Sequence, residues 1–372
     1  MIAAGPLAWV SRTPFLTRSD TLSAMRRATG SSGLVFVAAL FSCALCVAAD
    51  PAPDDRRSPA GPTVHKGDGW GIAGPGDWSV FPGGPPTTLL YLIGDGREGV
   101  PLFDGTLSVV KAGLQVQRFA DDGSTIKARV DADLKELTGS RNFTPLKEPQ
   151  VNMITLSDGT EAVLLRAEFI RRQNGRLSIN QKVYCQGAAG RHIVATGFVT
   201  CGRPGAQFVR AIGLPEFVEA HVRSLVLDPG KVDETKLSAA YKALDWSASA
   251  AIRKTSQAND LLERHEHAAA IKGFREALGL CPQIPAAHNG LAWALLERED
   301  ATPRDLAEAL REAKTAVEQT AELDYSALDT LAFAQERNGD KGAALAAVRK
   351  ALKLEPDHPD LRRRLEAIER GE

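Results

Sequence analysis

Small and large residues recur with a fixed spacing along the last third of the sequence, and this spacing constrains the fold most strongly. Its first copy, in residues 251–284, consists of Ala258, Ala270, Phe274, Ala277 and Pro282. The same positions in residues 325–358 hold Ala332, Ala344, Val348, Ala351 and Pro356. Alanine lets two helices cross closely, a large side chain fills the space between them, and proline ends the second helix. Each copy therefore predicts a helical hairpin of about 34 residues.

The middle unit, residues 285–324, follows the same pattern with an expansion. Gly290, Leu291 and Ala292 match its first helix, but the second helix matches only after an insertion around Glu299–Asp305, at Ala309, Ala313 and Ala316. Ala321 stands where the other units carry the closing proline. We therefore expect a longer loop inside this unit and a looser end to its second helix. Residues 359–370 are polar enough to form the capping helix that such a stack requires.

These units resemble the tetratricopeptide repeat family, which implies an all-α solenoid over residues 251–372 that holds a protein or peptide partner. The family lines its inner groove from the first helix of each unit, and the matching positions are Thr255, Asn259, Leu262, Asn289, Trp293, Leu296, Asp329, Phe333 and Glu336. Only Asn259 matches the clamp with which chaperone-binding members grip a C-terminal carboxylate, so such gripping is not implied. Trp293 and Phe333 favour an apolar groove for a helix or an extended peptide. The alternative is that both aromatic residues are core between repeats.

The region before the repeats, residues 67–228, has a different pattern. Short runs of alternating apolar residues predict strands at Leu107–Val116, Val151–Ser157, Ala162–Arg171, Leu177–Cys185 and His192–Cys201. Asp158-Gly159 and Asn174-Gly175 predict tight hairpins because these residues tolerate positive φ. Helices are expected at Ile126–Leu137 and Leu214–Ser224. The prediction is an α+β sandwich, an antiparallel sheet with helices packed on one side.

Several short segments of this region resemble the family shared by the photosystem accessory protein PsbP, the lipoprotein DcrB and a nuclear-import Ran-binding factor. They are Gly69-Trp70-Gly71-Ile72, Pro75-Gly76-Asp77-Trp78, Ala206-Gln207-Phe208 and Ser224-Leu225. The resemblance implies an α-β-α sandwich that acts by binding. The Trp78 region and the Ser224-Leu225 end carry over as features of the fold and not as a site.

The N-terminal region, residues 1–49, reads as a secretion signal. Residues 34–47 are an apolar run that follows Arg26-Arg27 and precedes small residues, so we expect cleavage after Ala49. Residues 1–24 exceed the length that such a signal needs, which favours Met25 as the true start. The alternatives are an uncleaved membrane anchor or a lipid-modified Cys43. Residues 50–66 are predicted to be a flexible linker and residues 229–250 a linking helix.

The sequence contains few motifs that are typical of catalysis, cofactor binding or metal binding. Gly69–Gly74 and Gly94–Gly99 both read G-x-G-x-x-G, but neither lies between a strand and a helix, so both are interpreted as turns. The pair of histidines in His265-Glu266-His267 has no third metal ligand within reach by sequence, and packing is the default reading. In a hairpin Cys185 would lie opposite about His192, far from Cys201, so we expect free thiols. No cofactor or metal is predicted.

The length and charge of the chain limit the number of domains and the kinds of partner. The chain has 372 residues, which suits about two domains, and a net charge of −1, which gives no basic excess for nucleic acid.

The leading hypothesis is an exported bacterial protein, not an enzyme, that binds other proteins through its repeats. A hydrolase with its site in the sheet region is one alternative, and it requires His192 and His221 to converge with a carboxylate. A carrier of a small ligand or lipid is another, and it requires an apolar cavity between sheet and helices.

Overall fold

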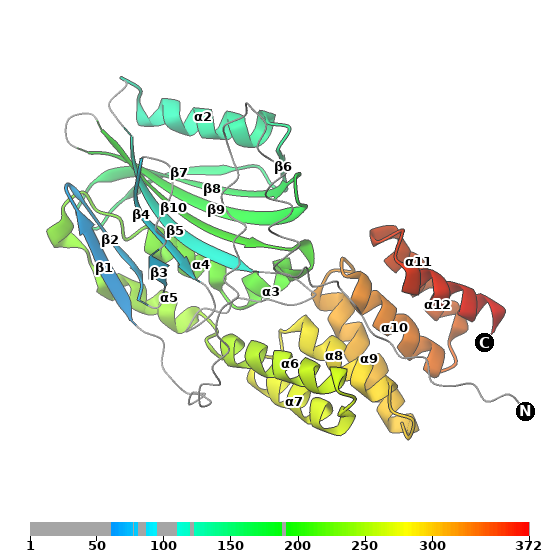
Figure 1. Cartoon of the computed structure of the whole chain (residues 1–372). Coiled ribbons are helices and arrows are strands. Elements are labelled where there is room, and N and C mark those ends of the chain that lie inside the picture. The colour runs from blue at the N-terminus through cyan, green and yellow to red at the C-terminus, as the bar shows by residue number, and fades with distance from the viewer. Residues whose placement is uncertain are drawn as a thin grey trace, which may run out of the picture. The chain divides into compact units, whose positions relative to one another are not determined.

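The structure is a computed structural model that describes residues 61–76, 78–80, 87–94, 110–119, 123–187 and 191–371. It consists of an antiparallel sheet region followed by a helical stretch (Figure 1). The predicted secretion signal lies outside the described residues, as do residues 50–60 and most of Gly94–Gly99. Among the helices that the structure describes, none is long and apolar enough to span a bilayer.

The main sheet has eight strands in the order β3-β4-β5-β10-β9-β8-β6, with β7 also paired to β8. Their bounds are β3 (Ser79–Val80), β4 (Thr88–Gly94), β5 (Lys111–Phe119), β6 (Phe143–Pro145), β7 (Gln150–Thr155), β8 (Glu161–Arg171), β9 (Arg176–Gln186) and β10 (His192–Cys201). All pairs are antiparallel. The two hairpins predicted from Asp158-Gly159 and Asn174-Gly175 are confirmed, and Gly159 and Gly175 have φ values of 89° and 66°.

The cysteines of this sheet lie apart on neighbouring strands. Cys185 on β9 is opposite Ile193, one residue from the expected position, and Cys201 is opposite Leu177. Both thiols are free and buried, as is that of Cys281 in the helical stretch. Burial raises the pKa of Cys185 to about 12 and that of Cys201 to about 11, so both thiols are protonated at neutral pH.

Helices cover both faces of the sheet (Figure 1). On one face, α2 (Ile126–Gly139) packs Val130 into a cluster with Leu165. On the other face, α4 (Leu214–Val222), preceded by η2 (Arg203–Gly205) and α3 (Ala206–Ala211), packs Phe217 into the large core that includes Leu164. The prediction of helices on one side was therefore wrong. Successive residues of β8 point to opposite faces, and Leu164 and Leu165 are both apolar, so both faces need cover.

A second, two-stranded sheet precedes the first. β1 (Pro62–Gly67) and β2 (Trp70–Pro75) form a hairpin whose turn contains Gly69 with φ 69°. Residues 62–66 are thus a strand and not the predicted linker, because they pair with a fully buried β2. The first G-x-G-x-x-G segment is accordingly a turn followed by a strand. The Ser224-Leu225 end lies beside β2, since the Ser224 hydroxyl accepts a hydrogen bond of 2.9 Å from the Ala73 N–H.

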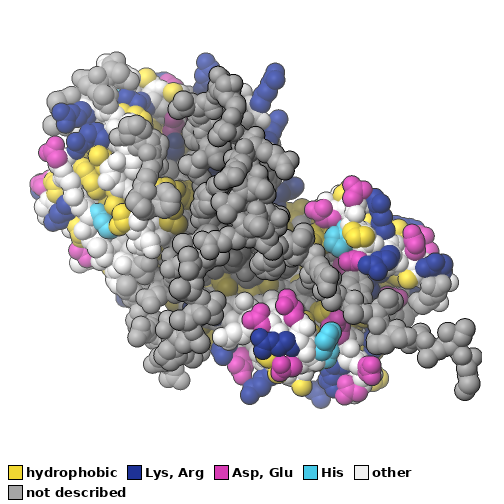
Figure 2. Space-filling view, in the orientation of Figure 1, with side chains coloured by type: hydrophobic (Ala, Val, Ile, Leu, Met, Phe, Trp, Pro, Cys, Tyr) yellow, Lys and Arg dark blue, Asp and Glu magenta, His cyan; other side chains and the backbone are white. Residues whose placement is uncertain are grey.

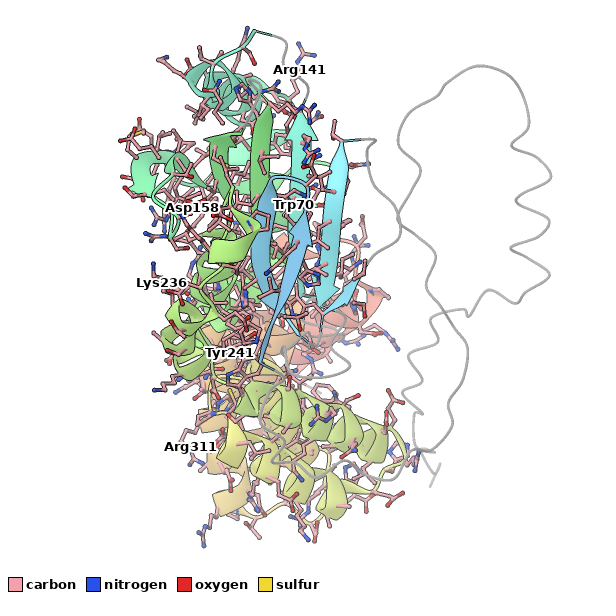
Figure 3. All side chains as sticks on the ribbon, turned by 90° about the vertical axis from the view of Figure 1, so that its left-hand side faces the viewer. Trp70, Arg141, Asp158, Lys236, Tyr241 and Arg311 are labelled. Carbon is pink, nitrogen blue, oxygen red and sulfur yellow. The ribbon has the colours of Figure 1, made fainter. Side chains whose placement is uncertain are left out.

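The segment that follows is not the continuous helix predicted over residues 229–250. It forms η3 (Pro229–Lys231), η4 (Glu234–Leu237) and α5 (Ser238–Ala243). Asp228 and Asp233 each accept a hydrogen bond from the backbone N–H two residues ahead, which stabilises separate turns. Trp70 and Tyr241 mark β2 and α5 in Figure 3.

The helical stretch consists of three antiparallel pairs and a last helix. They are α6 (Ser247–Glu263) with α7 (His267–Leu280), α8 (Pro285–Leu296) with α9 (Pro303–Gln319), α10 (Tyr325–Arg337) with α11 (Lys341–Leu354), and α12 (Pro359–Arg370). The longer loop expected in the middle unit is present at residues 297–302, where Thr302 and Asp305 form a capping box that starts α9. Without a closing proline, α9 runs to Gln319, and Ala321 and Glu322 then adopt positive φ.

The crossing of α7 and α8 shows why the repeat spacing requires its residue types. The Phe274 ring is fully buried against α8. A Cβ added at Gly290 would lie only 2.4 Å from the Phe274 Cζ atom. The close approach of these helices therefore requires glycine on one side and a large ring on the other.

Candidate peptide-binding groove

The first helices of the units present a narrow stripe of side chains. Ten of the twelve residues of α8 are buried, and the two that are not, Asn289 and Trp293, lie one turn apart on the same face. Asp329 and Phe333 repeat this spacing on α10 and are also half-buried. We call the surface formed by Asn289, Trp293, Asp329, Phe333 and Glu336 the groove.

Two aromatic rings meet at the centre of the groove. The centroids of Trp293 and Phe333 are 5.5 Å apart, with the ring planes tilted by 55°. Both side chains are half-buried, so neither is enclosed in the core between repeats. A pair of this geometry forms a continuous apolar surface.

Arg364 on α12 reaches into the groove, and the sequence reasoning missed it. Its guanidinium carbon lies 4.8 Å from the centroid of the Phe333 ring and 5.9 Å from a ring of Trp293. Its Nε donates to the Asp329 carboxylate at 2.6 Å, and its Nη1 lies 3.6 Å from a Glu336 oxygen. Burial raises the pKa of Asp329, while the charge of Arg364 opposes that rise. The groove therefore already holds one cation between aromatic and acidic side chains.

Other residues expected in the groove lie elsewhere. Leu296 is fully buried in the core at the end of α8, so its assignment to the groove was wrong. Thr255 is also buried, and its hydroxyl donates to the Ala251 carbonyl. Asn259 is exposed, and Leu262 is half-buried against the core. Apart from Leu296, the structure thus brings together the predicted groove residues of the second and third units, without those of the first.

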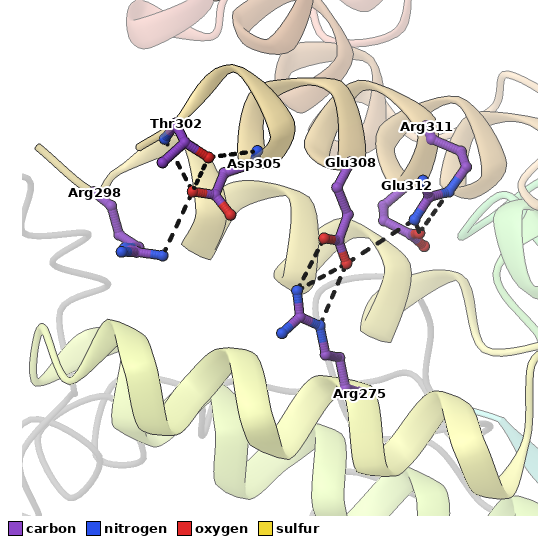
Figure 4. A network of polar contacts seen from close by, with 7 residues as sticks. All are labelled: Arg275, Arg298, Thr302, Asp305, Glu308, Arg311 and Glu312. Atoms are coloured by element: carbon purple, nitrogen blue, oxygen red, sulfur yellow. Dashed lines mark hydrogen bonds and ion pairs between the residues drawn. The ribbon is translucent and has the colours of Figure 1, made fainter. Parts of the chain in front are cut away.

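Ion pairs on the side of the stack join α7 to α9 (Figure 4). Arg275 donates to both oxygens of Glu308 at 2.9 Å. Glu312 accepts from Arg311 at 2.8 Å and pairs with a His288 nitrogen at 2.7 Å, and the His288 bond is the main cause of its lowered pKa. Positive and negative side chains are interspersed over the described helical surface in Figure 2. The partly exposed Arg275–Glu308 pair contributes about 0–1 kcal/mol, whereas the side chains of the His288–Glu312 pair are only 11 % and 10 % exposed.

The two histidines of the enzyme alternative do not converge. His192 lies at the start of β10, where its Nδ1 accepts a hydrogen bond from Arg129 on α2. His221 lies on α4, on the opposite face of the sheet, and its Nδ1 is 2.7 Å from the Ala73 carbonyl oxygen. A carbonyl only accepts, so His221 carries its proton on Nδ1. Within the described residues, no three His, Cys, Asp or Glu side chains cluster as metal ligands.

His221 is expected to make stability depend on pH. Burial lowers its pKa from 6.5 to about 4, so the folded protein holds it neutral where the unfolded chain protonates it. His221 should therefore lower the free energy of unfolding by about 3 kcal/mol as pH decreases from 6.5 to 4. Chemical denaturation of the wild type and of His221→Gln at several pH values measures this difference.

Comparing the wild type with His221→Gln separates the effect of His221 on stability from that of Asp324, which is opposite in sign. Burial raises the pKa of Asp324 to about 6, which favours the folded state as pH falls through that range. Asp324 is present in both proteins, so its contribution cancels in the difference. Identical pH profiles for wild type and His221→Gln would contradict the assignment.

The space between the sheet and α4 is filled rather than hollow. Leu164, Val183, Ala195 and Phe217 are at most 1 % exposed and belong to one core. A cleft of about 800 Å³ does open beside α4, but its walls include charged side chains such as the paired Arg166 and Glu219. The apolar cavity that a lipid carrier requires is therefore not found among the described residues.

Comparisons with known proteins concern the helical stretch. The first tetratricopeptide domain of Spaghetti (RPAP3), solved with the HSP90 peptide SRMEEVD, is 17 % identical, with a TM-score of 0.30, over 32 % of this chain and 91 % of that one. The Sgt2 tetratricopeptide domain of Aspergillus fumigatus is 23 % identical, with a TM-score of 0.29, over 32 % and 78 %. The Arabidopsis OM64 tetratricopeptide domain is 18 % identical, with a TM-score of 0.30, over 33 % and 98 %.

No family model and no curated protein matches the chain. The resemblance of the sheet region to PsbP and DcrB thus stays a prediction. The helical stretch, in contrast, is tetratricopeptide-like in its own geometry, with three antiparallel helix pairs and a capping helix.

Proposed function

We propose that this protein binds a protein or peptide partner through the groove of its repeats and acts as a scaffold rather than an enzyme. The observation that carries the proposal is the half-buried Trp293–Phe333 pair, which lies beside Asp329 and Glu336. Large aromatic side chains that stay partly open on a rigid helical surface are typical anchors of peptide recognition.

The composition of the groove indicates what a partner should present. Its aromatic floor suits an apolar or planar side chain, and its carboxylates suit a cation. Arg364 occupies this environment from within the chain, which demonstrates that a guanidinium fits there. A helical or extended segment with apolar residues is therefore the expected ligand, and an arginine of the partner would have to displace Arg364.

A displayed peptide library, selected on the full chain, tests this proposal. The peptides recovered should bind the wild type and lose at least about tenfold in affinity, roughly 1.4 kcal/mol, on Trp293→Ala/Phe333→Ala. Tyr325→Ala is the control, because Tyr325 is a half-buried aromatic of α10 whose ring packs on His358 and not on Trp293 or Phe333. Peptides that bind the double variant as tightly as the wild type would refute the groove as the site.

We further propose that the binding surface works outside the cytoplasm. The support is the apolar run at residues 34–47 after Arg26-Arg27. Intact-mass measurement of the protein recovered from an exporting bacterial host tests the proposal. A mature chain that begins at Asp50 is expected, and a chain that keeps residues 26–49 in the cytoplasmic fraction would contradict it.

A further inference from the structure

Strand β7 forms an edge of the main sheet that no other described strand covers. We infer that this edge pairs with β7 of a second copy of the chain and joins two sheets around a two-fold axis. The inference rests on the backbone geometry of β7, on its exposed side chains and on a comparison with the other edges of the two sheets.

The backbone groups of alternate β7 residues point away from the sheet. The Leu156 N–H donates to the Thr160 carbonyl at 2.9 Å, so the groups of Leu156 face β8. In an antiparallel ladder every second residue faces the same neighbour. The N–H and C=O groups of Val151, Met153 and Thr155 therefore face outward, where no described strand pairs with β7.

The side chains of the same edge are apolar and open to solvent. Val151 is 46 % exposed and Met153 68 %, and Leu146 just before β7 is 50 % exposed. The whole strand, Gln150–Thr155, contains no charged residue and no proline. Its pairing with β8 is regular throughout, without a bulge.

Other edges that the structure describes carry the features that prevent strand addition. β3 has only two residues, and its neighbour β4 contains a register shift between Thr88 and Leu90. β6, which lies along the same edge of β8 as β7, has three residues and ends in Pro145. β1 begins with Pro62 and carries Lys66 near its end. Pro149 directly precedes β7, but β7 itself has none of these features, so its edge is open to strand addition from Gln150 to Thr155.

The outward-facing N–H and C=O groups of β7 can pair with the same groups of a second, antiparallel copy. In an antiparallel pair centred on Met153, Met153 lies opposite its own copy and Val151 lies opposite Thr155 of the second chain. Each of these pairs exchanges two N–H···O=C bonds, so every outward group of the three residues gains a partner. The exposed Val151 and Met153 side chains of the two copies then share one face of the joined sheet.

A six-residue strand pair is a small interface. Pairing should therefore be reversible and should depend on protein concentration. It would place two repeat arrays in one particle, so that a partner with two binding segments gains by avidity.

Sedimentation equilibrium of the full chain tests the association. The mean mass of the wild type should rise toward that of a dimer as concentration increases. Met153→Lys places two ammonium groups opposite each other across the axis and should weaken association at least about tenfold. Mixing Met153→Lys with Met153→Glu should restore it.

Val80→Lys is the matched control, because Val80 is a 62 % exposed apolar residue on the opposite edge, in β3. It should leave association unchanged. Loss of association in Val80→Lys but not in Met153→Lys would place the interface at the other edge and overturn the inference. A wild type that stays monomeric at all concentrations would also overturn it.

Disulfide trapping tests the register. With Cys43 and Cys46 replaced by serine, Val151→Cys alone should not cross-link, because the two copies of residue 151 would lie about 13 Å apart, four residues along the strand. A mixture of Val151→Cys and Thr155→Cys should cross-link, because their Cα atoms would lie about 5.5 Å apart. Equal cross-linking of Val151→Cys alone and of the mixture would contradict the proposed register.

Discussion

Replacing Phe274 with alanine should lower the free energy of unfolding by about 3–5 kcal/mol. The ring is fully buried where α7 crosses α8, and the two helices cannot close the space that it would leave without moving the whole pair. Chemical denaturation measures the change. Lys272→Ala on the same helix is the control, since Lys272 is exposed and its loss should change stability by less than about 0.5 kcal/mol.

A second substitution tests whether the loss of stability in Phe274→Ala comes from the empty space beside Gly290 or from a weaker helix α7. Gly290→Ala alone should destabilise the protein, because its Cβ would overlap the Phe274 ring. In the Phe274→Ala background the overlap is gone, so the same methyl group should cost little or should stabilise. Equal effects of Gly290→Ala in both backgrounds would contradict the proposed contact.

Replacing Arg364 with alanine should cost about 2–4 kcal/mol. The side chains of Arg364 and Asp329 are only 11 % and 16 % exposed, so the variant leaves a carboxylate with little solvent and no guanidinium. The guanidinium also covers the Phe333 ring, and that contact is lost. Urea denaturation at pH 7 measures the change.

A double variant shows whether the loss of stability in Arg364→Ala comes from the unpaired Asp329 carboxylate. Arg364→Ala/Asp329→Asn removes the orphaned charge together with its partner, so it should be more stable than Arg364→Ala alone. If the single and double variants are equally unstable, the ion pair is not what holds α12 to the groove. The packing of the arginine stem would then be the main contribution.

The helical stretch could be predicted from the sequence because its pattern is local. The positions of Ala258, Ala270 and Phe274 follow from the geometry of one helical hairpin, which needs no knowledge of the rest of the chain. The longer loop of the middle unit was predicted for the same reason. The hairpins at Gly159 and Gly175 were also predictable, since a single residue with positive φ defines each turn.

The remaining features depend on contacts between distant segments. β1 was missed because its proline and charged residues are typical of a linker, and its pairing with β2 outweighs that composition. The helices were expected on one side of the sheet because alternation cannot give the side when Leu164 and Leu165 are both apolar. Arg364 was missed because three arginines follow one another in α12, and only the docked helix determines which of them enters the groove.

The reaction rates of the three buried thiols can report on local unfolding of the chain. A thiol that is protonated and enclosed reacts with a disulfide reagent only when its surroundings open. Burial raises the pKa of Cys281 to about 11, and this residue lies just after α7, whereas Cys185 and Cys201 lie in the sheet. Their labelling rates therefore report separately on the two halves of the described chain. The described fold needs no disulfide, and an oxidant reaches these three thiols only when the surrounding structure opens.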